Sequence, residues 1–398
     1  MITKMRLLRR ALKSLVWVLG ICVLIFLAAV WYYADMLRDK ALSLERDPTV
    51  YDLRVAAVGD DTITLEPVVE DPTDRWEKVG IWGLEWEGGY GRIKLSDSVT
   101  KESTTIHQFT VIEDEPAIGT LVTVDGFAFR GNPKTTRGVT FEDVLIQSFV
   151  GDCTLCLEDF PAWLTQGTKD SWVIFVHGKG SNRAEALRIL KEVSDAGYHT
   201  LSITYRNDEG LAQSESGFYG YGATEWKDLE AAVAFARDAG AENIALYGFS
   251  MGGAIVTSYL VNSEEQNGIT GAILDSPALS LEAAIDHGAE QTYLPVVGGS
   301  LPRPLTSTAK LVAKVRFGLD LDRINYLQRA DELTVPILLI QGDIDDTVPA
   351  WTSRQLATTR PDIVTYLELA NVGHVEGWNM EQQVYERAVL EFLSEQTE

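Results

Sequence analysis

The chain has 398 residues, long enough for one large domain and a small one or for two of ordinary size. Its composition, 45 % hydrophobic and 23 % charged, is that of a globular protein. Its formal net charge of −24 comes from 34 basic and 58 acidic residues. So acidic a chain offers no extended basic surface to neutralise phosphates, and we expect no nucleic-acid partner. We attribute the acidity to solubility or salt tolerance.

The N-terminal segment differs from the rest of the chain. Residues 1–14 form a basic flank without an acidic residue, and residues 15–34 carry no charge and end in Trp31-Tyr32-Tyr33. A helix of about 20 residues spans the hydrocarbon core of a bilayer. The aromatic end is typical of a membrane interface, whereas a cleaved signal peptide, the alternative, ends in small residues. We therefore expect a single-pass helix in the cell membrane, with a cytoplasmic N-terminus and an extracytoplasmic catalytic domain.

The next segments precede the large domain. Residues 35–49 are a charged stalk that Pro48 ends, and residues 50–160 are typical of a β-rich module. In that module, short alternating stretches such as "DTITLEP" and "GTLVTVDGFAF" are separated by glycine, asparagine and proline breaks. Cys153 and Cys156 are spaced C-x-x-C, which fits either a small-loop disulfide or two unpaired thiols.

From Ser171 the pattern changes to apolar, strand-like runs that alternate with helix-like stretches. "WVIFVH", "NIALYG" and "PILLIQG" are continuous apolar runs, and Glu225–Ala239 is one of the helical stretches between such runs. This alternation predicts a mostly parallel, doubly wound α/β sheet over residues 161–398, with helices on both faces. Sites in such sheets form at the carboxyl ends of the strands.

One strand-like run ends in Gly248-Phe249-Ser250-Met251-Gly252, the pattern G-x-S-x-G. In a strand-to-helix turn of this kind the serine takes strained dihedral angles and stands above the sheet. Side chains at Gly248 or Gly252 would collide with neighbouring backbone. An incidental serine in a glycine-rich turn is the alternative for the pentapeptide taken by itself.

The first long strand of this region ends in His177-Gly178-Lys179-Gly180. A glycine-rich turn lets backbone N–H groups point into a site, so the N–H groups of Lys179 and Met251 are candidates for an oxyanion hole. We interpret His177 as a structural residue of this turn rather than as a base.

Two later strands end in an acid and in an imidazole. "QGDIDDTVP" contains Asp345, and "ANVGHVEGW" places His374 on a loop before the last helix. A serine hydroxyl is a weak nucleophile until an imidazole takes its proton, and a carboxylate fixes the tautomer of that imidazole. The chain order Ser, Asp, His is the one expected for this architecture. Asp275 also follows a strand and is the alternative acid.

At these residues the chain resembles the α/β-hydrolase superfamily, over roughly Ala162–Glu398. Within it, the chain looks like membrane-anchored bacterial members of the serine aminopeptidase and esterase-like branch. The motifs that carry this likeness are "HGKGSNRAE", "YRND", "TEWKDLEAA", "GFSMGGAI", "LDSPAL", "GDIDDTVP" and "GHVEGWN". The resemblance implies an α/β-hydrolase fold with Ser250 as nucleophile, His374 as base and Asp345, from the spacing G-x-x-D-x-x-V-P, as acid. Some members take the acid from the earlier strand, which here ends in Asp275.

An insertion of about residues 276–335 precedes the aspartate strand, and in the superfamily such insertions cap the active site. Its basic residues belong either to a solvated helix face or to a surface that contacts anionic lipid headgroups. These residues are Arg303, Lys310, Lys314 and Arg316.

The sequence contains no clustered histidine and cysteine set and no G-x-G-x-x-G after the first strand, so we expect no metal and no cofactor. We predict a membrane-anchored serine hydrolase that cleaves a carboxylic ester or thioester of a small-molecule or lipid-like acyl substrate. A serine peptidase of the prolyl or aminopeptidase-like kind is the alternative. A catalytically silent, membrane-tethered binding module is a third interpretation. Nothing in the sequence indicates an oligomeric state or the role of residues 50–150.

Overall fold

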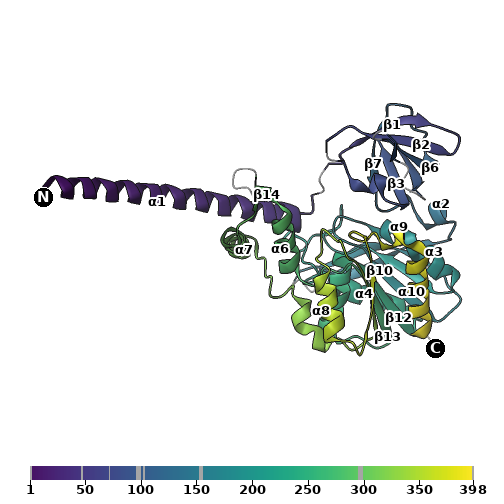
Figure 1. Ribbon diagram of the computed structural model, residues 1–398. Helices are drawn as coiled ribbons and strands as arrows, with labels where there is room; N and C mark the ends of the chain where they lie inside the picture. Colours follow the sequence, from purple (N-terminus) through teal and green to yellow (C-terminus); the bar gives the residue numbers. More distant parts are fainter. Residues whose placement is uncertain are drawn as a thin grey trace.

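The computed structural model describes residues 2–45, 48–70, 72–95, 100–101, 104–151, 156–294 and 299–396. A long N-terminal helix leads to a small sheet and to a larger sheet that is flanked by helices (Figure 1). Cys153 lies outside the described residues, and with it the pairing considered for Cys153 and Cys156.

The N-terminal helix α1 (Ile2–Leu37) continues into a short π-helix, η1 (Arg38–Leu42). In the described part of the chain, one helix is long and apolar enough to cross a membrane, judged by length and composition. Its side chains are largely exposed from Leu12 to Leu27. Figure 1 shows the N-terminal part of the helix extending away from the two sheets. The end of the segment differs from the expected stalk, because Leu42 is buried in the core of the large domain.

The small sheet is antiparallel, with strand order β2-β1-β7-β3-β4-β6-β5, and an additional pairing of β2 with β6 closes it into a small barrel. Its strands are β1 (Leu53–Val58), β2 (Thr62–Pro67), β3 (Gly80–Trp86), β4 (Gly89–Leu95), β5 (Thr100–Lys101), β6 (Thr104–Glu113) and β7 (Leu121–Asp125). The short helix η2 (Asp74–Glu77) precedes β3. Trp82 and Trp86 are buried in the barrel core, which confirms that this part of the chain is a β-rich module.

The larger sheet has the strand order β17-β16-β13-β12-β10-β11-β9-β8. Six neighbouring strands of this sheet, β17, β16, β13, β12, β10 and β11, pair in parallel. At one edge, β9 pairs antiparallel with β11, and β8 pairs antiparallel with β9. The strands are β8 (Glu142–Phe149), β9 (Leu157–Thr165), β10 (Ser171–Val176), β11 (His199–Ile203), β12 (Asn243–Phe249), β13 (Ile269–Asp275), β16 (Ile337–Gly342) and β17 (Val364–Leu369). We expected the β-rich module to extend to residue 160, but β8 already belongs to this sheet. An antiparallel edge strand shows the same polar and apolar alternation as a barrel strand.

Helices cover both faces of the larger sheet, as the sequence predicted for a doubly wound fold. Leu229, Ile255 and Leu356, from α4, α5 and α8, belong to one buried cluster, and Leu190 and Leu393, from α3 and α10, belong to the other. The helices of the domain are α2 (Pro133–Arg137), η3 (Arg183–Ala186), α3 (Leu187–Asp195), α4 (Trp226–Asp238), α5 (Met251–Asn262), η4 (Tyr326–Glu332), α8 (Trp351–Thr359), α9 (Gly377–Met380) and α10 (Gln382–Glu395).

The insertion between β13 and β16 contains α6 (Leu281–Gln291), the short pair β14 (Tyr293–Leu294) and β15 (Gly299–Ser300), and α7 (Arg303–Phe317). These elements lie beside the C-terminal end of α1 (Figure 1). The basic side chains of α7 pair within the protein: Lys310 with Glu282 and Asp286, Lys314 with Asp320, and Arg316 with Asp35. Arg303, whose side chain is exposed, lies 4.0 Å from a carboxylate oxygen of Glu290. All four expected basic residues therefore have a carboxylate partner within the protein.

Candidate active site

The nucleophile candidate stands on a sharp turn between β12 and α5. Ser250 has φ 50° and ψ −114°, a backbone conformation that is costly for any residue except glycine. A Cβ atom on Gly248 would lie 2.4 Å from the carbonyl oxygen of Gly252, and one on Gly252 would lie 2.1 Å from that of Val176. Both contacts are with backbone, which cannot move aside. The prediction of a strained turn that admits only glycine at these positions is confirmed.

Ser250, His374 and Asp345 form a continuous series of hydrogen bonds. The Nε2 atom of His374 lies 2.8 Å from Ser250 Oγ, and its Nδ1 atom lies 2.7 Å from Asp345 Oδ2. The three side chains come from the loops after β12, β17 and β16. The parallel order of these strands brings the carboxyl ends of all three to the same edge of the sheet.

The carboxylate of Asp345 is held in one orientation by the residues around it. Its Oδ1 atom accepts hydrogen bonds from the backbone N–H groups of Thr347 (2.9 Å) and Val348 (2.7 Å). Gln341 donates from Nε2 to Oδ2 at 2.8 Å, and Ser353 in turn donates to Gln341 Oε1. Because Asp345 is buried and has these donors, it can fix the ring of His374 without rearranging.

The surroundings of His374 shift its proton affinity. Burial lowers the pKa of this imidazole, but the charge of Asp345 and the hydrogen bond to it outweigh the burial, so that the pKa lies above its usual 6.5. Asp275 and Glu185 add to the shift from further away. This arrangement favours the protonated form of His374 relative to a free imidazole.

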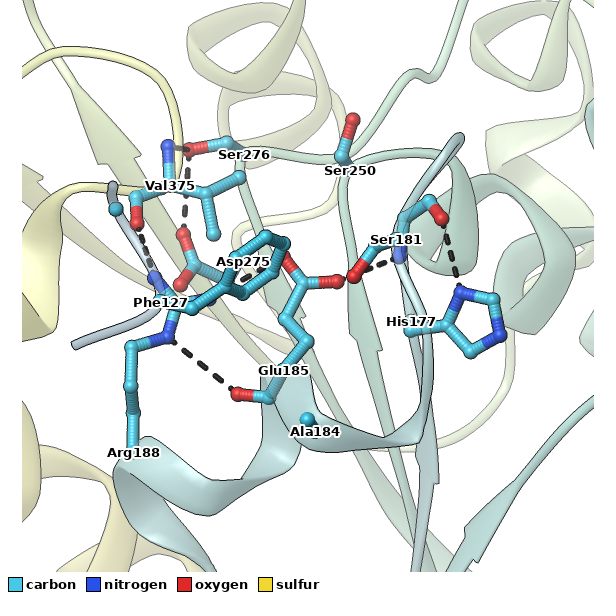
Figure 2. Close-up of polar contacts among 12 residues, drawn as sticks. Phe127, His177, Ser181, Ala184, Glu185, Arg188, Ser250, Asp275, Ser276 and Val375 are labelled. Atoms are coloured by element: carbon cyan, nitrogen blue, oxygen red, sulfur yellow. Dashed lines mark hydrogen bonds and ion pairs between the residues drawn. The ribbon is translucent and has the colours of Figure 1, made fainter. Parts of the chain in front are cut away.

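The alternative acid, Asp275, points elsewhere. Tyr385 donates its O–H to Asp275 Oδ2 at 2.7 Å, and Ser276 donates to Oδ1 at 3.2 Å. Burial raises the pKa of Asp275. Figure 2 shows Asp275 beside Ser276, at the base of the loop that carries Val375. Of the two candidate acids, the structure brings Asp345 into hydrogen-bond contact with His374.

The turn after β10 passes close to the nucleophile. A Cβ atom on Gly178 would lie 3.2 Å from the Cβ atom of Ser250. The N–H of Gly178 donates to Glu185 Oε2 at 2.7 Å, and this hydrogen bond holds the turn in place. The two expected oxyanion-hole residues flank this point, because Lys179 follows Gly178 and Met251 follows Ser250 in the chain.

His177 is built into the core of the turn. Its Nε2 atom lies 2.9 Å from Asp208 Oδ2, its Nδ1 atom lies 2.9 Å from the carbonyl oxygen of Gly178, and its ring stacks on Tyr205. Burial lowers the pKa of His177, but the charge of Asp208 and these hydrogen bonds leave it raised. These contacts tie the ring to Asp208 and to the backbone of the turn, in line with the structural role that we expected.

An ion pair that the sequence analysis missed connects this turn to the histidine loop. Arg188 contacts Glu185 Oε1 at 3.2 Å and donates to the carbonyl oxygen of Val375 at 2.7 Å. Figure 2 shows Arg188 reaching both partners. Val375 directly follows His374 and has a positive φ of 54°, and its N–H donates to Ser276 Oγ. Glu185 lies within the motif "HGKGSNRAE" quoted above. Arg188 lies outside that motif and looks like an ordinary helix residue, so the sequence did not indicate its contact with the histidine loop.

The small barrel also contacts the histidine loop. Glu376 is buried and accepts hydrogen bonds from Arg75 Nε at 2.8 Å and from Lys78 Nζ at 2.9 Å. Asn379 donates to two backbone carbonyl groups of the barrel region, at 2.7 and 2.9 Å. The module whose role the sequence left open is therefore packed on the segment that presents His374.

In the part of the chain that the structure describes, no group of three or more His, Cys, Asp or Glu side chains is placed to hold a metal ion. The carboxylates around Ser250 are engaged by hydrogen-bond donors instead, as described for Asp345, Asp275 and Glu185.

Comparisons with known proteins place this geometry in context. Residues 167–316 match a family model described as serine aminopeptidase, S33. The chain is 23 % identical to the uncharacterised protein YqkD of Bacillus subtilis over 56 % of this chain and 70 % of that protein. It is 24 % identical to human protein ABHD12B over 44 % of this chain and 46 % of that protein. Among solved structures, the esterase Pf2001 of Pyrococcus furiosus matches with a TM-score of 0.53 and 20 % identity, over 68 % of this chain and 95 % of the esterase. At that identity the likeness is one of fold.

Proposed function

Because this chain has the α/β-hydrolase fold, we propose that it is a serine hydrolase that cleaves a carboxylic ester or thioester through an acyl-enzyme intermediate. The observation that carries the proposal is the hydrogen-bonded series of Ser250, His374 and Asp345 at the carboxyl edge of the sheet. A serine that was merely incidental to a glycine-rich turn would need neither the imidazole at 2.8 Å nor the carboxylate behind it.

In the acylation step, Ser250 Oγ attacks the carbonyl carbon of the substrate while His374 Nε2 takes the hydroxyl proton. Asp345 keeps the proton on Nδ1 and stabilises the imidazolium. The negative charge that develops on the carbonyl oxygen is met by the backbone N–H groups of Lys179 and Met251, the second of which lies at the N-terminus of α5. The imidazolium then gives its proton to the departing alcohol or thiol, and an ester joins the acyl group to Ser250.

In the deacylation step, His374 takes a proton from a water molecule, whose oxygen attacks the acyl carbon. The intermediate collapses, the proton returns from His374 to Ser250 Oγ, and a carboxylic acid leaves. The strained turn holds the backbone of Ser250 above the sheet, and the hydrogen bond to His374 orients Oγ before attack.

The proposal includes anchoring of the protein in the cell membrane by α1, with residues 1–14 in the cytoplasm and the catalytic domain outside. It is supported by the exposed apolar stretch of α1 and by the basic flank before it. Protease treatment of intact spheroplasts should degrade the catalytic domain, and the mature protein should keep its first residues. A mature N-terminus after residue 34 would indicate a cleaved signal peptide instead.

A peptidase is the second candidate, because the family model that matches residues 167–316 is described as a serine aminopeptidase. It would use the same acyl-enzyme chemistry with an amine as the leaving group. The third candidate, a silent binding module, would keep the fold but would not react with an acylating probe.

Fluorophosphonate labelling tests the central proposal. The wild type and the control variant Ser216→Ala, which changes an exposed serine, should be labelled, and Ser250→Ala should not be. Absence of labelling in folded wild type would favour the silent module. Comparison of 4-nitrophenyl esters with aminoacyl anilides as substrates then separates an esterase from a peptidase, through the ratio of their kcat/KM values.

A further inference from the structure

We propose that the cavity between the C-terminal end of α1 and the cap helices binds the hydrocarbon chain of a lipid ester, so that the apolar N-terminal helix forms one wall of the substrate site. The inference rests on the proposed hydrolase function and extends it to the class of acyl group. It also gives the end of the helix a part in substrate selection, beyond that of an anchor.

The cavity has a volume of about 460 Å³, within the range of small-molecule sites, and its lining is mainly apolar. One wall comes from α1 and η1, where Tyr33, Met36, Leu37 and Lys40 line it. These residues follow the spacing i, i+3, i+4, i+7 and therefore share one face. The opposite wall comes from the cap, mainly from α6.

The wall on α1 is fixed to the cap. Ala34 is fully buried, and Val30 packs against Leu301 and Leu305 of the cap. Arg316 donates to Asp35 at 2.8 Å and also covers the ring of Trp31 at 3.7 Å. A surface that only touched the cap loosely would have no such set of buried and paired side chains.

Two contacts link the walls of the cavity to segments that carry proposed catalytic residues. Asp346 and Thr347, on its wall, directly follow Asp345, and the N–H of Thr347 donates to the Asp345 carboxylate. On another side, the carbonyl oxygen of Lys40 accepts a hydrogen bond from the side chain of Lys179, at 2.9 Å from Nζ. The cavity therefore lies next to the acid loop and the turn of Lys179, and neither Ser250 nor His374 is among the residues that line it.

The position of the cavity along α1 identifies its occupant. Trp31 and Tyr32 are exposed at the end of the apolar stretch, where aromatic side chains mark the interface of a bilayer. Tyr33 and Met36, which line the cavity, lie within the next two turns, at about 1.5 Å per residue. A hydrocarbon chain that leaves the outer leaflet therefore meets a mainly apolar cavity within a few residues of the aromatic belt.

Gly288 of α6 gives a direct test, because it lines the cavity and a Cβ atom there would meet no atom within 4 Å. The variant Gly288→Phe has room for its Cβ atom, and its ring should occupy part of the cavity. Glu290→Phe places the same ring on an exposed turn of the same helix, outside the cavity, and serves as the matched control. Ala284→Leu is a second, smaller filling of the cavity.

The full chain in phosphatidylcholine vesicles is assayed with 4-nitrophenyl butyrate and 4-nitrophenyl laurate. In the wild type we expect kcat/KM to rise with chain length, by up to about fourfold per buried methylene. In Gly288→Phe the laurate-to-butyrate ratio should fall by about tenfold, equal to the loss of roughly two buried methylenes, and Ala284→Leu should lower it less. Glu290→Phe should keep the wild-type ratio.

Fluorophosphonate labelling of Ser250 in each variant distinguishes failure of the proposed hydrolase function from failure of the proposed acyl-chain site. No labelling of the wild type would remove the hydrolase function itself. Normal labelling with an unchanged laurate-to-butyrate ratio in both filled variants would overturn the acyl site alone, as would an equal loss for the two esters.

A readout without turnover is the binding of a dansyl-labelled fatty acid to the Ser250→Ala variant. Adding Gly288→Phe to this variant should weaken the binding, and adding Glu290→Phe should not. Laurate ester in the same vesicles as the enzyme should react faster than ester in separate vesicles, and equal rates would overturn entry from the bilayer.

Discussion

Lys78 and Glu376 form an ion pair, with 2.9 Å between Nζ and Oε2, that joins the small barrel to the loop of His374. Glu376 lies two residues after His374 and is only 4 % exposed. Burial lowers the pKa of Lys78, but the hydrogen bond and charge of Glu376 leave it raised, so the lysine stays charged in this contact. The barrel is therefore in contact with the loop that carries the imidazole.

We predict that Lys78→Ala lowers kcat with little change in KM, because it leaves a buried carboxylate short of a partner and loosens the histidine loop. Arg75 still pairs with Glu376, so the loss in the free energy of unfolding should stay below the roughly 3–5 kcal/mol of a fully broken buried pair. Lys78→Arg should restore kcat, and Lys94→Ala, on an exposed side chain of the barrel, is the control. An unchanged kcat in a destabilised Lys78→Ala would show that the barrel does not position the loop.

The second prediction concerns pH. His374 acts as a base only when neutral, and its pKa is raised above 6.5 chiefly by Asp345, so kcat/KM should rise with pH through a midpoint above 6.5. Asp345→Asn removes that charge, so the midpoint should move down. The same change in a serine protease lowers kcat by about 10⁴, and we expect a loss of that order.

Asp275→Asn is the comparison for this experiment. Burial already raises the pKa of Asp275, and its partners are Tyr385 and Ser276 rather than His374. We expect it to change stability more than the pH midpoint. The assignment of the acid would be wrong if Asp275→Asn moved the midpoint and Asp345→Asn did not.

The third prediction tests the turn below the nucleophile. In Gly252→Ala the new Cβ atom would lie 2.1 Å from the carbonyl oxygen of Val176 and 2.6 Å from that of His177. Since both atoms are backbone, we expect a loss of at least about 2 kcal/mol in the free energy of unfolding, measured by urea denaturation. Gly288→Ala, where the added atom meets open space in a helix, should gain up to about 1 kcal/mol. Equal stabilities of the two variants would contradict the geometry of the turn.

The fourth prediction concerns the barrel at low pH. His107 on β6 is buried, neither ring nitrogen has a hydrogen-bond partner among the described residues, and burial lowers its pKa to about 4. The unfolded chain binds the proton near pH 6.5, whereas the folded barrel resists it until about pH 4. Stability should therefore fall as the pH drops between these values, by roughly 2–3 kcal/mol in all.

His107→Leu should remove this dependence, which is measured by denaturation at pH 7, 5 and 4 through tryptophan fluorescence, to which Trp82 and Trp86 in the barrel core contribute. His287→Leu, on the cap, is the control, because it leaves the barrel intact. The same slope of stability against pH in wild type and His107→Leu would refute the prediction.

The parallel sheet was predictable because its strands are buried on both faces and are continuous apolar runs. The nucleophile turn was predictable because Gly248, Ser250 and Gly252 leave a local pattern. The place of β8 in the larger sheet was not predictable, because polar and apolar residues alternate in an antiparallel edge strand as they do in a strand of the barrel.

Contacts between distant segments left no pattern in the sequence. Arg188 holds the carbonyl of Val375, and Lys78 pairs with Glu376, yet each of these charged residues looks like an ordinary surface residue in its own stretch of sequence. Such pairs depend on the tertiary fold, which a single sequence does not display.

The docking of η1 on the large domain has a consequence for how the protein stands on its helix. Leu42 is buried in the main core, Tyr221 donates to the carbonyl of Ala41, and Arg316 holds Asp35. The domain therefore cannot tilt on α1 as it would on a loose tether. If α1 stands in a bilayer, as proposed, the same side of the domain faces the lipid at all times, and the edge that carries Ser250 keeps a constant height above it.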